Sequence, residues 1–139
     1  MNTYSKKSLT LKTANRAIDA AIHKAIQLKM TISVVVLDES GILKAYSRMD
    51  GAPLIAFDAA LKKAKTAVGF GMPSGESWYN FIKDDPILSQ GVSSLDNFTL
   101  LGGGIPITLD SELVGAIGVS GGHYAQDEEC AKAGYDAIK

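Results

Sequence analysis

The chain has 139 residues, of which 46% are hydrophobic and 21% charged, and its formal net charge at pH 7 is -1. This length suits one domain with its own core, and a near-neutral charge without a long basic run argues against nucleic-acid binding. No apolar run approaches the ~20 residues that span a bilayer, no secretory signal is evident, and the single cysteine, Cys130, excludes an internal disulfide. We therefore expect one cytoplasmic domain over residues 1–139, with residues 1–8 as a loose N-terminal segment.

A first helix is predicted from about residue 10 to residue 30, where apolar residues recur at three- and four-residue steps. Thr10 is a candidate for its N-cap. A β-hairpin should follow, because a β-branched run, 32–37, and a shorter run, 43–47, flank a short loop that contains glycine.

A second helix is predicted from Leu54 to Val68, since Pro53 suits a first helical turn and Gly69 and Gly71 suit an end. Lys62, Lys63 and Lys65 should form a solvated face of this helix. Its expected buried side comprises Leu54, Phe57, Leu61, Ala64 and Val68.

Signals of regular structure weaken between residues 72 and 101, where aromatic side chains gather. A short helix is expected from Glu76 to Lys83, followed by a break at Asp84-Asp85-Pro86. A short edge strand is expected from Phe98 to Leu101.

The most distinctive stretch runs from Gly102 to Gly122 and consists of two apolar runs with glycines before and after them. Asp110 and Ser111 between the runs are typical of a hairpin turn. The second run, 113–119, should be a central strand covered on both faces, and its glycines indicate a bulge or a close approach of another backbone or ligand. A last helix is expected over 123–139.

The predicted order is helix, hairpin, helix, irregular segment, hairpin and helix. Single strands and helices do not alternate in it, which argues against a doubly wound parallel sheet. Hairpins form antiparallel sheets, and the helices can cover the faces of such a sheet. The sequence therefore predicts an α+β domain.

Complete chemical motifs are not found. His123 and Asp127 could share a helix face but lack a third metal ligand, and Ser120 lies outside a Gly-x-Ser-x-Gly elbow. The glycines before the last helix could bind an anion through backbone amides, although acidic residues in its first turn favour simple capping. His23, on the polar side of the first helix, is either a surface or subunit-interface histidine or an axial ligand of an iron tetrapyrrole. Cys130 is expected to be packed and unreactive.

Six motifs follow one another along the chain: Val35–Gly41, Arg48–Ala52, Lys63–Ala67, Gly103–Ile107, Gly115–Gly122 and Gln126–Glu128. In this order they resemble the GlcG/HbpS family, which includes the C-terminal module of PduO-type corrinoid adenosyltransferases. The resemblance covers roughly Leu9 to Gly134.

This resemblance implies a profilin-like three-layer α/β/α fold, with a five-stranded antiparallel sheet, helices on both faces and assembly into homo-oligomers. It also implies a role in binding haem or a related tetrapyrrole, in some members with haem breakdown. Members accompany pathways of the diol, glycerol or glycolate type. Adenosyltransferase chemistry in the longer relatives belongs to a separate N-terminal domain.

The first functional hypothesis is a small-ligand-binding accessory protein, with haem as the best single guess and no catalytic residue. The ligand would lie between the Arg48–Asp50 loop, the Trp78–Phe81 segment and the glycine stretches, with Arg48 pairing with propionates. The alternatives are a non-catalytic oligomeric interaction protein and, less favoured, an enzyme acting on a small polar metabolite. The candidate ligand-binding residues are Arg48, Asp50, Trp78, Gly103, Gly104, Ser120, Gly121 and Gly122, with His23 as the candidate haem ligand.

Overall fold

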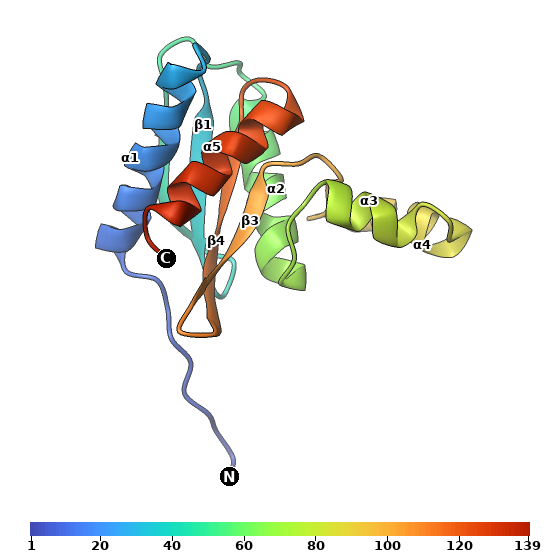
Figure 1. Cartoon of the computed structure of the whole chain (residues 1–139). Helices are drawn as coiled ribbons and strands as arrows, with labels where there is room; N and C mark the ends of the chain where they lie inside the picture. The colour runs from blue at the N-terminus through green and yellow to red at the C-terminus, as the bar shows by residue number, and fades with distance from the viewer.

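A computed structural model describes residues 1–139 and shows one antiparallel sheet between two layers of helices (Figure 1). The sheet has four strands in the order β2-β1-β4-β3. The strands are β1 (Ser33–Asp38), β2 (Leu43–Arg48), β3 (Gly104–Leu109) and β4 (Glu112–Ser120). The helices are α1 (Leu11–Gln27), α2 (Ala56–Phe70), α3 (Glu76–Ile82), α4 (Pro86–Gly91) and α5 (Tyr124–Asp136), with a short 3-10 turn, η1 (Val92–Ser94).

The alternation of side chains along β1 explains the layers. Val34 and Val36 point into a core formed with α1 and α5, whereas Val35 and Leu37 point to the opposite face and pack on α2. The predicted α+β class, with helices on both faces of an antiparallel sheet, is confirmed. β4 lies between β1 and β3 and is buried on both faces, as its apolar sequence predicted.

The prediction of five strands is wrong, because the expected edge strand at Phe98–Leu101 does not form. The Thr99 amide donates to Oγ1 of Thr66 in α2 at 2.9 Å instead of to a neighbouring strand. That hydroxyl itself lies 2.9 Å from the Lys62 carbonyl oxygen and 3.2 Å from the Asn97 carbonyl oxygen, so a helix side chain takes up the Thr99 amide. β3 therefore forms one edge of the sheet.

The buried side of α2 agrees with the prediction in part: Ala64 is buried, and Phe57, Leu61 and Val68 pack half-buried against Val35 and Leu37 of β1. Leu54 precedes the helix and is 92% exposed. The helix packs on the sheet through alanines, because Gly118 of β4 brings the two backbones together: a Cβ at this position would overlap the Ala60 carbonyl oxygen. Lys63, expected on a solvated face, is buried, and the residues of α2 that are buried are Ala56, Ala60, Lys63, Ala64, Thr66 and Ala67.

Helices α3 and α4 project from the three-layer body as an arm (Figure 1). A small separate cluster holds this arm together, and Trp78 is at its centre, with its ring 4.7 Å from Phe70 and 5.1 Å from Phe98. α4 begins after Asp85, whose carboxylate accepts from the amides of Ile87 and Leu88, so the expected break at this site is also a helix start.

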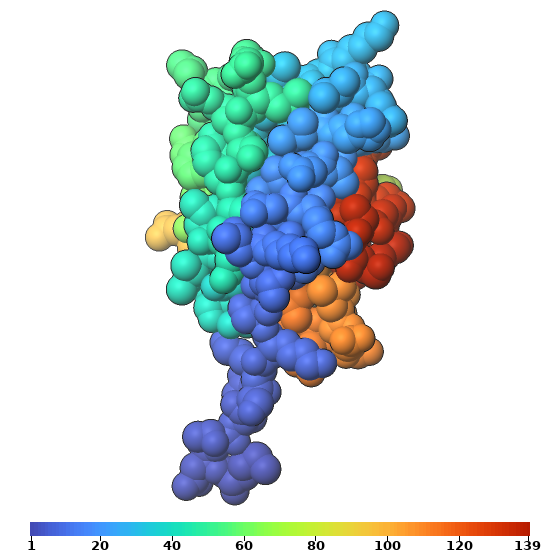
Figure 2. Space-filling view, turned by 90° about the vertical axis from the view of Figure 1, so that its left-hand side faces the viewer, coloured from blue at the N-terminus to red at the C-terminus, as the bar shows by residue number.

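The first ten residues form no helix or strand and extend below the body beside α1 (Figure 2). Leu9 is buried, and its amide donates to the Val114 carbonyl at 3.2 Å. Lys6 contacts Glu39 at 3.5 Å in the β1–β2 turn. Thr10 is the N-cap of α1, as expected. None of the helices combines the length and the apolarity that a membrane span requires.

Candidate functional site

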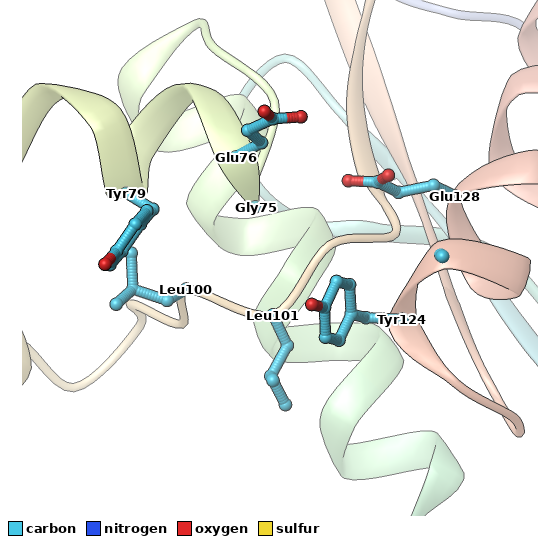
Figure 3. A pocket seen from close by; sticks show the side chains of 8 residues that line it. Gly75, Glu76, Tyr79, Leu100, Leu101, Tyr124 and Glu128 are labelled. Carbon is cyan, nitrogen blue, oxygen red and sulfur yellow. The ribbon is translucent and has the colours of Figure 1, made fainter.

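Three segments that are far apart in the sequence surround an open cavity of about 560 Å³ (Figure 3). They are the start of α3, the loop that leads into β3, and the first turns of α5. The lining combines tyrosine and leucine side chains with two carboxylates. The lining residues are Gly75, Glu76, Tyr79, Leu100, Leu101, Tyr124, Ala125 and Glu128.

Local hydrogen bonds fix the walls of this cavity. The Ser74 amide donates to the Gly104 carbonyl at 3.0 Å, and the Gly104 amide donates to the Ser74 hydroxyl at 2.9 Å. These two hydrogen bonds attach the connection between α2 and α3 to the start of β3. Gly75 then opens α3 with a φ of 105°, a conformation that glycine adopts without strain.

Glu128 lies over backbone that has no side chains. A Cβ on Gly102 would overlap the Glu128 side chain, and a Cβ on Gly75 would lie 2.6 Å from its Oε1. The carboxylate makes no hydrogen bond or ion pair within the protein. Partial burial, reinforced by the charge of Glu76, raises the pKa of Glu128, while Lys63 opposes this shift. In Figure 3 the carboxyl groups of Glu76 and Glu128 face each other across the cavity.

Behind the cavity, Lys63 and Asp127 form a buried ion pair with an N–O distance of 2.9 Å. Lys63 Nζ also donates to the Val119 carbonyl at 2.9 Å, and Asp127 Oδ1 accepts from the Gly122 amide at 3.0 Å. Burial lowers the pKa of Lys63, and the bond to Asp127 opposes that change. The pair connects α2, the end of β4 and the first turn of α5. The charged groups of Lys63 and Asp127 both have their hydrogen-bond partners within the protein.

Gly103 and Gly104, two of the predicted ligand-binding residues, pack closely against this ion pair at the start of β3. A Cβ at Gly103, whose φ is 125°, would lie 2.6 Å from the Val119 carbonyl oxygen and 3.1 Å from the Lys63 stem. A Cβ at Gly104 would overlap the Lys63 carbonyl. Trp78 belongs to the cluster inside the arm, and the neighbouring Glu76 and Tyr79 line the cavity instead.

The other predicted ligand-binding residues lie at the same end of the sheet but away from the cavity. Arg48 pairs with Ser33 across the first hairpin, and Ser33 pairs with Ser120 on β4, which places the three residues in one row. Three strand spacings, about 14 Å, separate β2 from β3 in a sheet of this order. Arg48 and the nearby, exposed Asp50 therefore do not line the cavity between α3 and α5.

The glycine turn before α5 uses its backbone donors internally. The Gly122 amide bonds Asp127, and the Ala125 amide donates to Nδ1 of His123 at 3.1 Å in a capping box. Gly121 packs against Thr31 and Ile32. This turn is capped by its own chain, and since Asp127 is buried while His123 is exposed, the two do not face the same way.

His23 lies on the exposed side of α1, where its Nε2 is 3.2 Å from Gln27 Nε2, and its Nδ1 has no protein partner. Cys130 is buried, and burial raises the pKa of its thiol to about 11, which suits a packed and unreactive residue.

Sequence reasoning missed Tyr124 and Glu128 as cavity residues. The gathering of aromatic residues near Trp78 did indicate the arm, but nothing local shows that α5 faces it. That proximity depends on β3 and β4 forming a hairpin beside α2.

Comparisons with known proteins agree with this architecture. The family described as "Haem degrading protein HbpS-like" matches residues 9–136. The chain is 33% identical to Protein GlcG of Escherichia coli K12 over 84% of each chain. Its fold matches Klebsiella pneumoniae protein ORFY with a TM-score of 0.90, 25% identity and coverage of 99% of this chain and 95% of that one. It also matches PduOC, solved as a haem complex, with a TM-score of 0.87, 28% identity and coverage of 95% and 96%. The chain therefore belongs to the HbpS-like family.

Proposed function

We propose that the chain is a small-ligand-binding accessory protein of a diol, glycerol or glycolate pathway, and that haem or a related tetrapyrrole is its ligand. The observation that carries this proposal is the similarity, over nearly the whole length of both chains, to PduOC in its haem complex. The family description as haem-degrading proteins points to the same ligand.

The two histidines differ in their suitability as iron ligands. Nδ1 of His123 accepts a hydrogen bond from the Ala125 amide in the α5 cap, which requires the tautomer that carries its proton on Nε2. Neither nitrogen is then free to donate electrons to a metal without breaking the cap. His23 keeps Nδ1 without a partner on an exposed helix face. A neutral imidazole is a common axial ligand of haem iron, which favours His23.

Arg48 supplies the charge that haem propionates require. The chain passes from the end of α1 into β1, whose first residue, Ser33, pairs with Arg48. The C-terminal half of α1 and the end of β2 therefore share one end of the molecule. A guanidinium there suits carboxylates through paired hydrogen bonds. The cavity beside α3 fits propionates poorly, because no lysine or arginine lines it.

When bound, haem would supply iron for ligand binding or redox chemistry, and the role of this chain is to hold it. Because His23 is exposed, a macrocycle beside it would remain open to water on one side in a single chain. We propose that a second copy covers this side, which makes the protein a homo-oligomer.

Titration with haemin tests the proposal. The wild type should give a saturable, shifted Soret band, and His23→Ala should abolish the shift or weaken the affinity at least tenfold, on the order expected for a lost iron ligand. His123→Ala, which removes the other histidine, is the matched control and should bind like the wild type. No saturable band in the wild type would refute haem as the ligand. Equal binding by both variants would refute His23 as its iron ligand.

A non-catalytic interaction protein is the second candidate, because the arm and the segment after it carry large apolar side chains that are exposed. These are Tyr79, Phe81, Ile87 and Leu95. Sedimentation at micromolar concentration tests the homo-oligomer that both proposals assume. A monomer with and without haemin would contradict it.

A further inference from the structure

We propose that the cavity between α3 and α5 binds an organic ammonium ligand with an apolar body, through the carboxylates of Glu76 and Glu128 and the rings of Tyr79 and Tyr124. This site is separate from the haem site proposed around His23, and the two proposals can fail independently.

The cavity is negatively charged without a compensating cation. Its lining contains two carboxylates and no basic residue. The nearest ammonium group behind it, that of Lys63, is bonded to Asp127 and Val119. In the neighbouring groove that also contacts Glu128, Lys132 and Lys139 both pair with Asp136, at 2.7 and 2.9 Å.

Packing fixes the position of the Glu128 carboxylate. The absent side chains of Gly75 and Gly102 leave the space that its carboxylate occupies. Its helix is fixed by the adjacent Asp127, which is 1% exposed and bonded to Lys63. A carboxylate that is positioned by packing but has no hydrogen-bond donor of its own loses little freedom when a donor arrives.

The walls suit a cation with an apolar body. Tyr79 and Tyr124 approach the cavity from α3 and α5, and Leu100 and Leu101 from the loop between them (Figure 3). Aromatic faces attract cations, most strongly when water is partly excluded, and the leucines would cover a hydrocarbon portion. A cavity of about 560 Å³ accommodates a small organic molecule.

The same residues do not favour a metal ion. No group of three or more His, Cys, Asp and Glu side chains is close enough to hold one. Calcium prefers six to eight oxygen ligands and zinc four, so two carboxylates leave either ion short of protein donors. An ammonium group needs only a few acceptors and tolerates an open site.

Calorimetric titration of the full chain with benzylammonium tests the assignment, with benzyl alcohol and benzoate as neutral and anionic matches. Benzylammonium should bind saturably and at least about tenfold more tightly than either match, in keeping with charged hydrogen bonds. Glu128→Gln should weaken it by about tenfold or more, and Glu76→Gln should also weaken it. Glu129→Gln removes the same charge from a neighbour outside the lining and should leave the affinity unchanged.

The pH dependence provides a second readout. The titratable groups around Glu128 lie on three sides: Glu76 and Tyr79 on α3, Lys63 on α2, and Tyr124, Lys132, Tyr135, Asp136 and Lys139 on α5 and just after it. Because the pKa of Glu128 is raised above 4.5, benzylammonium affinity should fall as the pH is lowered through that raised pKa, and Glu128→Gln should remove most of the fall. Equal affinity for benzoate, or equal loss in Glu128→Gln and Glu129→Gln, would overturn the proposal. Haemin binding should be unaffected by Glu128→Gln, so the test of one site does not decide the other.

Discussion

Replacing Lys63 by methionine should destabilise the protein strongly, although the two side chains have similar volume. The substitution leaves the carboxylate of Asp127, 1% exposed, with the Gly122 amide as its remaining donor. It also removes the donor to the Val119 carbonyl. Breaking a buried ion pair by removing one partner typically costs about 3–5 kcal/mol, since the other charge stays buried.

For a domain of this size, a loss of that magnitude corresponds to a decrease in Tm of roughly 10–15 °C. Thermal and urea unfolding followed by far-ultraviolet circular dichroism would measure it. Lys62→Met is the matched control, because Lys62 is the exposed neighbour on the same helix, and it should change the unfolding free energy by less than about 0.5 kcal/mol.

The double variant Lys63→Met/Asp127→Asn separates the ion pair from simple packing. The introduced asparagine would still accept from Gly122 through its side-chain oxygen, and neither charge would remain buried. We expect the double variant to be more stable than Lys63→Met alone, with a coupling of about 2 kcal/mol or more for groups in direct contact. If Lys63→Met and Lys62→Met unfold alike, or if the two substitutions of the double variant are additive, the ion pair does not hold α5 to α2.

Two further predictions concern packing and pH. Gly118→Ala should destabilise the protein by about 1–3 kcal/mol, because the new Cβ overlaps the backbone of α2. Gly69→Ala, where a Cβ on α2 meets no other atom, should be neutral or stabilise by up to about 1 kcal/mol. Urea unfolding of both variants would measure the two changes. The Ser8 side chain and the Glu39 backbone amide, with smaller contributions from Ser40 and Lys6, lower the pKa of Glu39 to about 2, which carboxyl-carbon NMR titration should detect. Since this pKa lies below the ordinary 4.5, the stabilisation by Glu39 is complete above pH 4.5 and is lost as the pH falls towards 2. A value near 4.5 in the wild type would show that the N-terminal segment is not held there.

Local pattern was sufficient for most of the architecture. The hairpins follow from apolar runs around turn residues, and α1 from its three- and four-residue period together with the Thr10 cap. The buried face of α2 was predicted in part: Phe57, Leu61 and Val68 do pack on the sheet, but the buried alanines Ala56, Ala60 and Ala67 were missed. What decides that face is the missing side chain of Gly118, which lies on another element.

The candidate site depends on contacts that a linear pattern does not contain. Lys63 was expected in solvent because its partner, Asp127, lies 64 positions away along the chain. A short edge strand was expected at 98–101, and the family resemblance implied five strands, yet the side chain of Thr66 takes up the Thr99 amide. The predicted residues did gather at one end of the sheet, but the width of the sheet separates Arg48 from the arm.

The packing of Trp78 makes the arm optically distinct from the rest of the molecule. It is the only tryptophan in the chain, and it is buried among Ile82, Val92 and Phe98 rather than in the core of the sheet. Emission excited at the red edge of indole absorption therefore comes from the arm alone, while circular dichroism reports mainly on the three-layer body. Comparing the two signals during unfolding would reveal whether the wall that carries Glu76 and Tyr79 opens before the domain does, without any label.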